Sequence, residues 1–342
     1  MVATDARPLR AGKRAPLSLL AGLLLLFAAV CASFALGARA IPLPEVWAAL
    51  QGAGSNDVVV TVTDLRLGRT LLGLLAGSAL GAAGVLMQSL TRNPIADPGL
   101  LGVNAGAAFG VALAIAVFGT LSQPATILAA FVGAGLAAGV VFVFAGASNT
   151  ANSPVRLTLS GVAIAAILAG FTHALVATNE RVLDEFRFWR VGSLLAHGLR
   201  DIAWFLPAIL VGLLLTLYLS RTLDTIALGD DSALALGVNP ARTRLIGLLA
   251  VTILAGTATA LVGPITFVGL AVPHLVRRVV GPRHTLVVPL SILIAPALLL
   301  AADVVGRLIG GYGEVPVGVV TALIGAPLLA LMVIFGGKGK LG

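Results

Sequence analysis

The chain has 342 residues, of which 58% are hydrophobic and only 11% are charged, and its mean hydropathy is +1.06. A soluble globular domain is about 45–50% apolar and about 25% charged, so the composition excludes an ordinary soluble domain and indicates an integral membrane protein. The net charge of +8 is explained better by membrane topology than by nucleic-acid binding, because the basic residues lie between the apolar runs. The single cysteine, Cys31, excludes an intrachain disulfide framework and a cysteine-rich metal site.

Ten apolar segments approach the roughly 20 residues that a membrane-spanning helix needs. A backbone in hydrocarbon must satisfy its own hydrogen bonds, so each segment is expected to be a helix. The chain is therefore predicted to be an all-α polytopic membrane protein, with ten transmembrane helices in a single domain over residues 1–342. The predicted spans are residues 17–37, 67–90, 99–119, 124–146, 157–178, 202–220, 245–262, 264–280, 286–309 and 316–336.

The distribution of basic residues predicts the orientation of these spans. Residues 17–37 resemble a signal peptide, but the apolar run is too long, so we interpret them as the first span after a tail of residues 1–16. With both chain ends in the cytoplasm, the cytoplasmic segments hold 14 of the 22 Lys and Arg residues, and the outer segments hold 8. The same orientation places residues 221–244 in the cytoplasm.

Residues 221–244 form a polar island between two predicted spans. Six charged residues lie in it: Arg221, Asp224, Asp230, Asp231, Arg242 and Arg244. The Asp-Asp-Ser start at Asp230 can cap a short helix, and its small apolar face is formed by Ala233, Leu234, Leu236 and Gly237. We expect this helix at the membrane surface, where a soluble partner can push on it; an ordinary solvated loop is the alternative.

The sequence contains a weak internal repeat. Residues 75–84 match residues 254–263 at five positions, and the two segments lie in spans that cross in opposite directions, as in an inverted-topology repeat. Each copy precedes a stretch that is predicted to break a helix. The residues concerned are Arg92, Asn93, Pro94, Asp97, Pro98 and Gly99 after the first copy, and Gly263, Pro264 and Pro273 after the second. Asp97, between two prolines, is predicted to be a turn residue.

Sequence signals for an enzyme are nearly absent. The four histidines are scattered without metal-ligand spacing, and no phosphate-binding GxxxxGK[ST] motif occurs. We therefore expect no catalytic, cofactor-binding or metal-binding residues in the chain. An ion-coupled carrier usually needs ionisable groups within the membrane. Asp303 and Arg307 are spaced to form an i,i+4 pair there, and a structural and a functional interpretation of that pair stay open.

Arginines also gather at the outer ends of two predicted spans. Arg66 and Arg69 lie at the start of the second span, and Arg307 lies near the end of the ninth. Arginine pairs with carboxylates in a fork geometry, which would suit an acidic partner. Anchoring at lipid headgroups is the competing interpretation.

Four longer motifs occur in order along the chain: Leu90–Gly106, Gly263–His274, Leu300–Arg307 and Val315–Pro327. Together they resemble the iron-siderophore and cobalamin permeases of ABC importers, the FecCD/BtuC-like permeases, over nearly the whole chain beyond its N-terminal residues. Residues 186–194 and 242–250 look most similar to the ferric-enterobactin permease subunits. The resemblance implies the fold of a type II ABC importer permease, with spans 2–5 and 7–10 as an inverted repeat.

The resemblance also implies partners and a substrate. It implies a second permease subunit, with a heterodimer favoured over a homodimer, two cytoplasmic ABC ATPases that hydrolyse ATP, and an extracytoplasmic siderophore-binding protein, all at a bacterial inner or plasma membrane. The implied substrate is an intact ferric siderophore, with a catecholate-like one favoured; haem and cobalamin are the alternatives.

Finally, the resemblance assigns roles to residues. The ATPase is expected to bind the segment 221–244 through Asp230, Asp231, Ala233, Ala235, Leu236, Gly237, Val238 and Asn239. The binding protein is expected to meet Arg66, Arg69 and Arg307. The family often has Leu-Pro after the first of these arginines, whereas this chain has Leu67-Gly68, so a looser backbone is expected there.

Overall fold

The computed structural model describes residues 11–146, 154–195, 199–310 and 313–336, and the regular elements in these ranges are all helices. The α-helices are α1 (Ala11–Ala35), α2 (Leu43–Leu50), α3 (Asn56–Val60), α4 (Leu67–Leu90), α5 (Val103–Phe118), α6 (Gln123–Gly146), α7 (Pro154–Thr178), α8 (Glu180–Arg190), α9 (Leu199–Ile226), α10 (Asp230–Ala235), α11 (Pro240–Val262), α12 (Val268–Val280), α13 (His284–Gly310) and α14 (Val317–Gly336). A π-helical turn, Thr61–Arg66, joins α3 to α4, and a 3₁₀ turn, Pro98–Leu101, precedes α5. The predicted all-α class is confirmed.

A helix lies over each of the ten predicted spans, but the described segments long and apolar enough to cross a membrane number seven. They are Pro16–Ala35, Asn56–Leu90, Gln123–Ala145, Val155–Thr178, Leu199–Ile226, Pro240–Val262 and His284–Ile309. The short helices have a local cause. Gly102 before α5 and Phe267 before α12 both have left-handed backbone, with φ of 73° and 70°, so each helix starts several residues later than the apolar run.

Helix α4 is the centre of the bundle and packs against α13, α11, α12 and α9. Its glycines allow these close contacts. A Cβ on Gly77 would overlap the backbone of Pro296 in α13, and one on Gly84 would overlap the carbonyl of Gly269 in α12. Small residues permit such backbone contact in membrane bundles.

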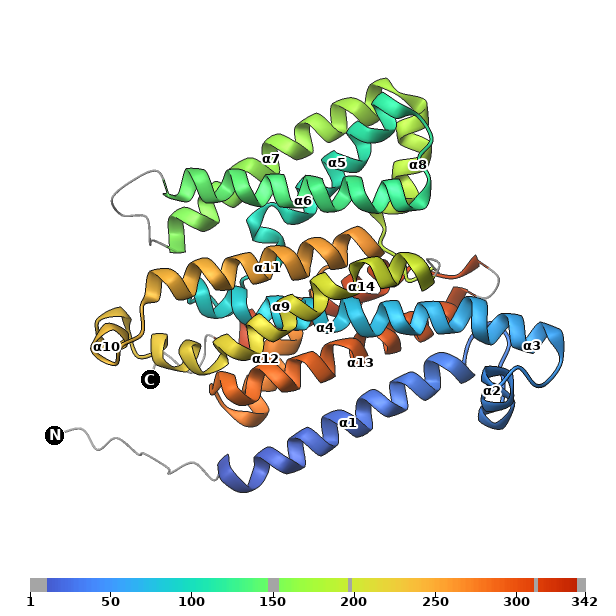
Figure 1. Cartoon of the computed structure of the whole chain (residues 1–342), viewed down its shortest axis with the longest axis horizontal. Helices are drawn as coiled ribbons and strands as arrows, with labels where there is room; N and C mark the ends of the chain where they lie inside the picture. The colour runs from blue at the N-terminus through green and yellow to red at the C-terminus, as the bar shows by residue number, and fades with distance from the viewer. Residues whose placement is uncertain (1–10, 147–153, 196–198, 311–312, 337–342) are drawn as a thin grey trace.

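Figure 1 shows how the other helices are arranged around this centre. Helices α5, α6, α7 and α8 form a group on one side of α11, and α1 lies along the opposite side of the molecule, next to α13. The N-terminal end of α1 and helix α10 lie at one end of the bundle, whereas α2, α3 and α8 lie at the other. We call these the α10 end and the α2/α3 end. The predicted tail 1–16 lies largely outside the described residues, and α1 already begins at Ala11.

The polar island 221–244 consists of helical segments and short connections. The sixth span was predicted to end at residue 220, and the structure corrects this end. Helix α9 continues to Ile226, so part of the island is a helical extension of that span. Residues 227–229 then lead into α10, and residues 236–239 lead into α11. Asn239 caps α11, since its Oδ1 accepts a hydrogen bond from the backbone N–H of Arg242 at 3.1 Å.

The predicted capping role of Asp230 is wrong. The residue that precedes α10 is Gly229, with a φ of 110°, and no side chain caps the helix. Asp230 is the first helical residue, and its carboxylate is drawn away from the helix terminus by two guanidinium groups.

Candidate functional site

The first candidate site is the surface of α10, at the end of the molecule. Its residues are Leu228, Leu234, Ala235, Leu236 and Gly237, and all of them are exposed. Three leucines are more than half exposed, at 67%, 58% and 65% in chain order. Of the other predicted residues, Ala233 is buried, Val238 is half-buried, and Asp231 and Asn239 are exposed. An exposed apolar patch of this kind marks an interaction surface more often than a free one.

Two ion pairs hold the start of α10 to the rest of the bundle. Nη2 of Arg244, in α11, lies 2.8 Å from Oδ2 of Asp230, and Nη2 of Arg92 lies 2.6 Å from Oδ1 of the same carboxylate. Arg92 also donates to the carbonyl of Ile226 at 3.3 Å, from a backbone with a φ of 52°. Partial burial raises the pKa of Asp230, but the guanidinium groups of Arg244 and Arg92 outweigh it, and the pKa lies below its ordinary value.

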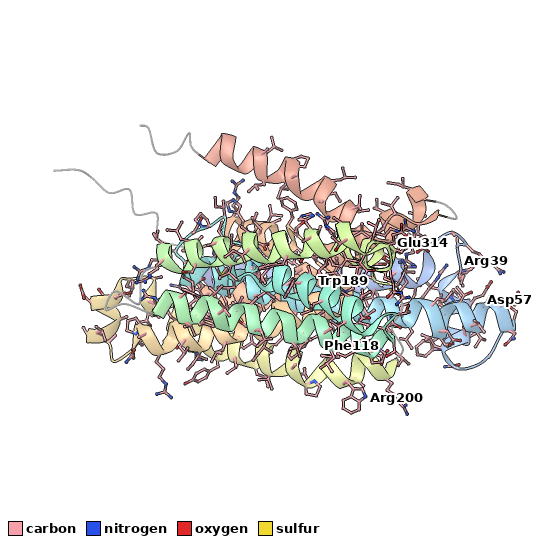
Figure 2. The ribbon with its side chains drawn as sticks, turned by 90° about the horizontal axis from the view of Figure 1, so that it is seen from above. Arg39, Asp57, Phe118, Trp189, Arg200 and Glu314 are labelled. Atoms are coloured by element: carbon pink, nitrogen blue, oxygen red, sulfur yellow. The ribbon has the colours of Figure 1, made fainter. Side chains whose placement is uncertain are left out.

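The second candidate site is a charge cluster that joins α4, α13 and residue 314. Arg69 donates to both carboxylate oxygens of Glu314, at 2.8 and 3.1 Å, and to Asp303 at 3.1 Å. The predicted i,i+4 pair is confirmed, with Arg307 Nε 3.0 Å from Asp303 Oδ2. Figure 2 shows that Glu314 lies toward the same end as Arg39 and Asp57, which is the α2/α3 end.

Arg66 and Arg307 also contact the end of α1 and the residues that follow it. Arg66 donates to the backbone carbonyls of Phe34 and Arg39. Arg307 donates to the carbonyls of Ser33 and Leu36, at 3.1 and 3.0 Å. Arginine side chains that satisfy backbone carbonyls at the end of a helix stabilise that end, so these contacts fix α1 against α4 and α13.

The three arginines predicted to meet a binding protein are buried in this structure. Their exposed fractions are 5% for Arg66, 9% for Arg69 and 3% for Arg307. Their charge is therefore used inside the chain. For Arg307 the pair with Asp303 was predicted, whereas for Arg66 and Arg69 neither docking nor headgroup anchoring anticipated this role. Docking by these residues stays a prediction. The acceptors involved could not be identified from sequence, because Asp303 and Glu314 are 234 and 245 residues from Arg69.

The two predicted helix-breaking stretches lie against each other, since a Cβ on Gly269 would be 3.1 Å from Cδ of Pro98. Asp97 is a turn residue as predicted, since its Oδ1 accepts from the N–H of Gly99 at 2.8 Å and caps the 3₁₀ turn. From the other stretch, the carbonyl of Leu270 accepts from Gln88 Nε2 of α4 at 3.1 Å. Thr259 Oγ1 in α11 donates to Asn104 Oδ1 in α5 at 2.9 Å. Side-chain hydrogen bonds between helices thus join the two halves of the chain close to these stretches.

The helix-breaking assignment of Pro273 is wrong, because Pro273 lies inside α12. Proline has no N–H to donate to the carbonyl four residues earlier. Here that carbonyl belongs to Gly269, which lies against Gly84 and is 3.5 Å from Gln88 Nε2. The same nitrogen donates to the carbonyl of Leu270 at 3.1 Å, so a side chain from α4 compensates for the proline in this turn of α12.

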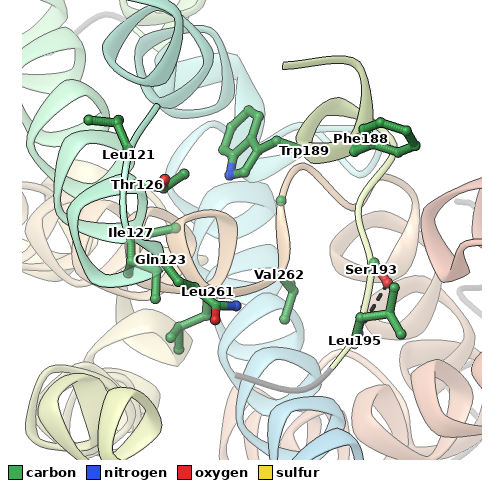
Figure 3. A pocket seen from close by; sticks show the side chains of 12 residues that line it. Leu121, Gln123, Thr126, Ile127, Phe188, Trp189, Ser193, Leu195, Leu261 and Val262 are labelled. Atoms are coloured by element: carbon green, nitrogen blue, oxygen red, sulfur yellow. Dashed lines mark hydrogen bonds between the residues drawn. The ribbon is translucent and has the colours of Figure 1, made fainter. Parts of the chain in front are cut away.

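A hollow of about 330 Å³ lies where the start of α6 meets the ends of α8 and α11 (Figure 3). Polar and aromatic side chains line the hollow, including those of Gln123, Thr126, Trp189 and Ser193. The Oγ of Ser193 accepts from the N–H of Leu195 at 3.1 Å, and the N–H of Ser193 donates to Val262 at 2.8 Å. The volume is near the lower limit of small-molecule sites. Nothing in the sequence pattern had indicated this hollow.

Comparison with known proteins gives these sites a context. The chain is 49% identical to the ferric enterobactin transport system permease protein FepD of Escherichia coli (strain K12), over 91% of this chain and 93% of that protein. It is 37% identical to the iron(3+)-hydroxamate import system permease protein FhuB of Bacillus subtilis (strain 168), over 90% and 80%. It is 39% identical to the cobalamin import system permease protein BtuC of Halobacterium salinarum, over 82% and 75%.

A solved structure has the same fold. A metal-chelate type ABC transporter in an inward-facing conformation superposes with a TM-score of 0.82 at 30% identity, covering 93% of this chain and 99% of that one. The family model of the FecCD transport family matches residues 24–335. The chain therefore belongs to the FecCD transport family.

Proposed function

We propose that the chain is the permease subunit of an ATP-driven ABC importer that moves an intact ferric siderophore across a bacterial inner membrane. The observation that carries this proposal is the 49% identity with a ferric enterobactin permease over 91% of the chain. The same similarity favours a catecholate siderophore. A relative that is named for cobalamin is also similar over most of the chain, so cobalamin, and haem with it, are the alternative substrates.

The proposed topology has ten spans, with both termini and α10 in the cytoplasm. It includes α5, α12 and α14, the shorter helices that lie over predicted spans. Helices α4–α7 and α11–α14 would be the two halves of an inverted repeat. In support of this, both halves have a long, buried first helix and a left-handed residue before a short second helix. The charge distribution supports the orientation, since 14 of the 22 basic residues fall on the proposed inner side.

We propose that the surface of α10 binds the partner ATPase. Two features support this: the exposed leucines, and the small residues Ala235 and Gly237 beside them, which leave room for a close approach. ATP acts only through that partner, and the chain itself holds no cofactor in this proposal. Two ATPase copies and a second, different permease subunit complete the complex. A secondary carrier driven by an ion gradient is the alternative class.

On the outer side, a siderophore-binding protein is proposed to dock at the α2/α3 end. The buried arginines support this only if docking rearranges their contacts with Glu314, Asp303 and the end of α1. Glu314 is the most accessible partner in this cluster, with a side chain that is 34% exposed.

The substrate is proposed to cross as an intact chelate. The chain has one cysteine, three methionines and four histidines, spread along the sequence, a poor set of ligands for taking iron from a chelator. The test is to purify the chain with its native partners, reconstitute the complex, and compare uptake of ferric enterobactin, a ferric hydroxamate, haem and cobalamin. The proposal predicts that ferric enterobactin is imported fastest. Import of haem or cobalamin without any ferric siderophore would refute the substrate and leave the transporter class intact.

A further inference from the structure

A second acidic residue near α10 has contacts that the proposed docking does not explain. Asp224, in the last turns of α9, accepts a hydrogen bond from the backbone N–H of His284 at 2.6 Å, and its other oxygen lies 3.5 Å from the N–H of Thr285. These are the first residues of α13. A carboxylate from one helix therefore caps the N-terminus of another, where negative charge is stabilising.

The contact continues from α13 into α4 through the imidazole of His284. Its Nδ1 lies 2.9 Å from Asp224 Oδ1 and carries a proton, since a carboxylate only accepts. Its Nε2 shares a hydrogen bond of 2.7 Å with Ser89 Oγ, near the end of α4. Arg277 of α12 donates to the same Oγ at 3.4 Å. One chain of polar contacts thus links α9, α13, α4 and α12.

This chain of contacts starts next to α10. Only residues 227–229 separate the end of α9 from α10, so a displacement of α10 acts directly on the last turns of α9. Asp230, on the other side of this connection, holds Arg92 and Arg244. The two carboxylates flank the connection, and each is fixed to different helices. In Figure 1 the end of α9 and the start of α13 both lie toward the α10 end.

The contact between Asp224 and His284 is better suited to transmitting a movement between helices than to stabilising the fold. The side chain of His284 is 8% exposed and that of Asp224 is 32% exposed, and a partly buried polar pair of this kind is seldom more stabilising than an apolar one. What a network of hydrogen bonds provides is one defined geometry between the groups it joins. Apolar side chains at these positions would allow α9 to slide against α13.

We infer that Asp224 and His284 are positioning residues that transmit movement of α10 to α13, α4 and α12 during transport. The inference rests on the proposed function, because it presupposes that an ATPase moves α10. It assigns to Asp224 a role distinct from docking: the ATPase still binds and hydrolyses ATP when the contact is lost, but the movement no longer reaches the transport pathway.

The test uses the complete complex with its ATPase and binding protein in proteoliposomes. Radio-iron uptake from ferric enterobactin and ATP hydrolysis are measured in the same preparation, and their ratio is the readout. In Asp224→Ala, which removes both acceptor oxygens, co-purification of the ATPase is expected to be unchanged. Uptake per ATP is expected to fall at least about fivefold, the lower end of the coupling factors typical of two linked sites.

Two further variants test whether a lower ratio comes from the broken chain of contacts or from misfolding. In His284→Asn the shorter amide can still reach Asp224 but not Ser89, and Ser89→Ala removes the last contact while leaving the cap of α13 intact. Both are expected to lower the ratio as well. The matched control is Asp201→Ala, at the opposite end of α9, which is expected to keep the ratio of the wild type.

The outcomes distinguish the two proposals. A ratio within twofold of the wild type in Asp224→Ala or in Ser89→Ala would overturn the inference, and so would an equal loss in Asp201→Ala. A loss of ATPase co-purification in Asp224→Ala would also overturn it, since the residue would then act in docking. Absence of ATP-driven uptake by the wild-type complex would instead overturn the proposed function itself.

Discussion

Arg92 and Asp230 are 138 residues apart in sequence, and their side chains are 2.6 Å apart in the structure. One follows the end of α4, the central helix, and the other begins α10 at the surface. The contact therefore connects the centre of the bundle to the proposed ATPase-binding surface. With the Arg244 pair from α11, it fixes the position of α10 by charge.

This contact makes the position of α10 dependent on pH. The pKa of Asp230 is lowered in the folded protein, so the stability that its carboxylate contributes is present above the ordinary value, about 3.9. It is lost as the pH falls through the lowered folded-state value. We expect a nitroxide at Ser232→Cys, in a Cys31→Ser background, to become more mobile only below the ordinary pKa.

The control for this titration is the same label in an Asp230→Asn chain. Without the carboxylate, the label is expected to be mobile at neutral pH and to show no further change in acid. An identical pH dependence in both chains would mean that another group controls the position of α10.

The close packing of α4 gives a second prediction. A Cβ on Gly84 would overlap the carbonyl oxygen of Gly269, whereas a Cβ on Gly135 in α6 would meet nothing within 4 Å. Gly84→Ala is expected to destabilise the protein by about 1–3 kcal/mol through overpacking. Gly135→Ala is expected to be neutral, or stabilising by up to about 1 kcal/mol through helix propensity. Thermal unfolding midpoints in detergent, measured at one heating rate, compare the two, and an equal decrease in both would contradict the packing described for α4.

The arginine cluster gives a third prediction. Arg69→Ala removes one partner of Asp303, which is 3% exposed, and breaking a buried pair costs about 3 kcal/mol or more. The control is Arg187→Ala, since the Arg187–Asp184 pair has side chains that are 58% and 65% exposed and is expected to contribute less than about 1 kcal/mol. The measurement is again the unfolding midpoint.

The same variants test docking. If Arg69 acts only within the chain, Arg69→Ala and Arg307→Ala should lower stability with no change in affinity for the binding protein at a temperature where both are folded. A weaker, less salt-dependent affinity at that temperature would support the predicted docking role, because contacts between surface charges are screened over about 8 Å at physiological ionic strength.

Much of this fold was predictable from composition and pattern, and the partners of the charged groups were not. Apolar runs placed a helix at all ten positions, because burial in lipid constrains each segment by itself. Arg69 pairs with Asp303 and Glu314, and Asp224 with His284, only because their helices are neighbours in the fold. The sequence alone does not tell which helices become neighbours. Pro273 was misjudged for the same reason: its effect on α12 depends on Gln88, a side chain from α4.

The proposed orientation has a direct test. Ser55 and Ser232 are both exposed and lie at opposite ends of the molecule, near α3 and in α10. In a Cys31→Ser background, a membrane-impermeant thiol reagent is expected to label Ser55→Cys in intact cells, and to label Ser232→Cys only after the membrane is opened. Labelling of residue 232 in intact cells would reverse the orientation.

The central claim is that ATP, acting through α10, drives import. The most direct measurement is uptake of ferric enterobactin by proteoliposomes that contain the complete complex, with ATP supplied on the ATPase side, for the wild type and for Ala235→Glu. The wild type is predicted to import only with ATP and to be insensitive to ionophores. Ala235→Glu, which places a bulky charge on the exposed α10 surface, is predicted to abolish uptake and weaken co-purification of the ATPase while membrane insertion stays normal. Uptake without ATP that ionophores abolish, or unchanged uptake by Ala235→Glu, would contradict the account.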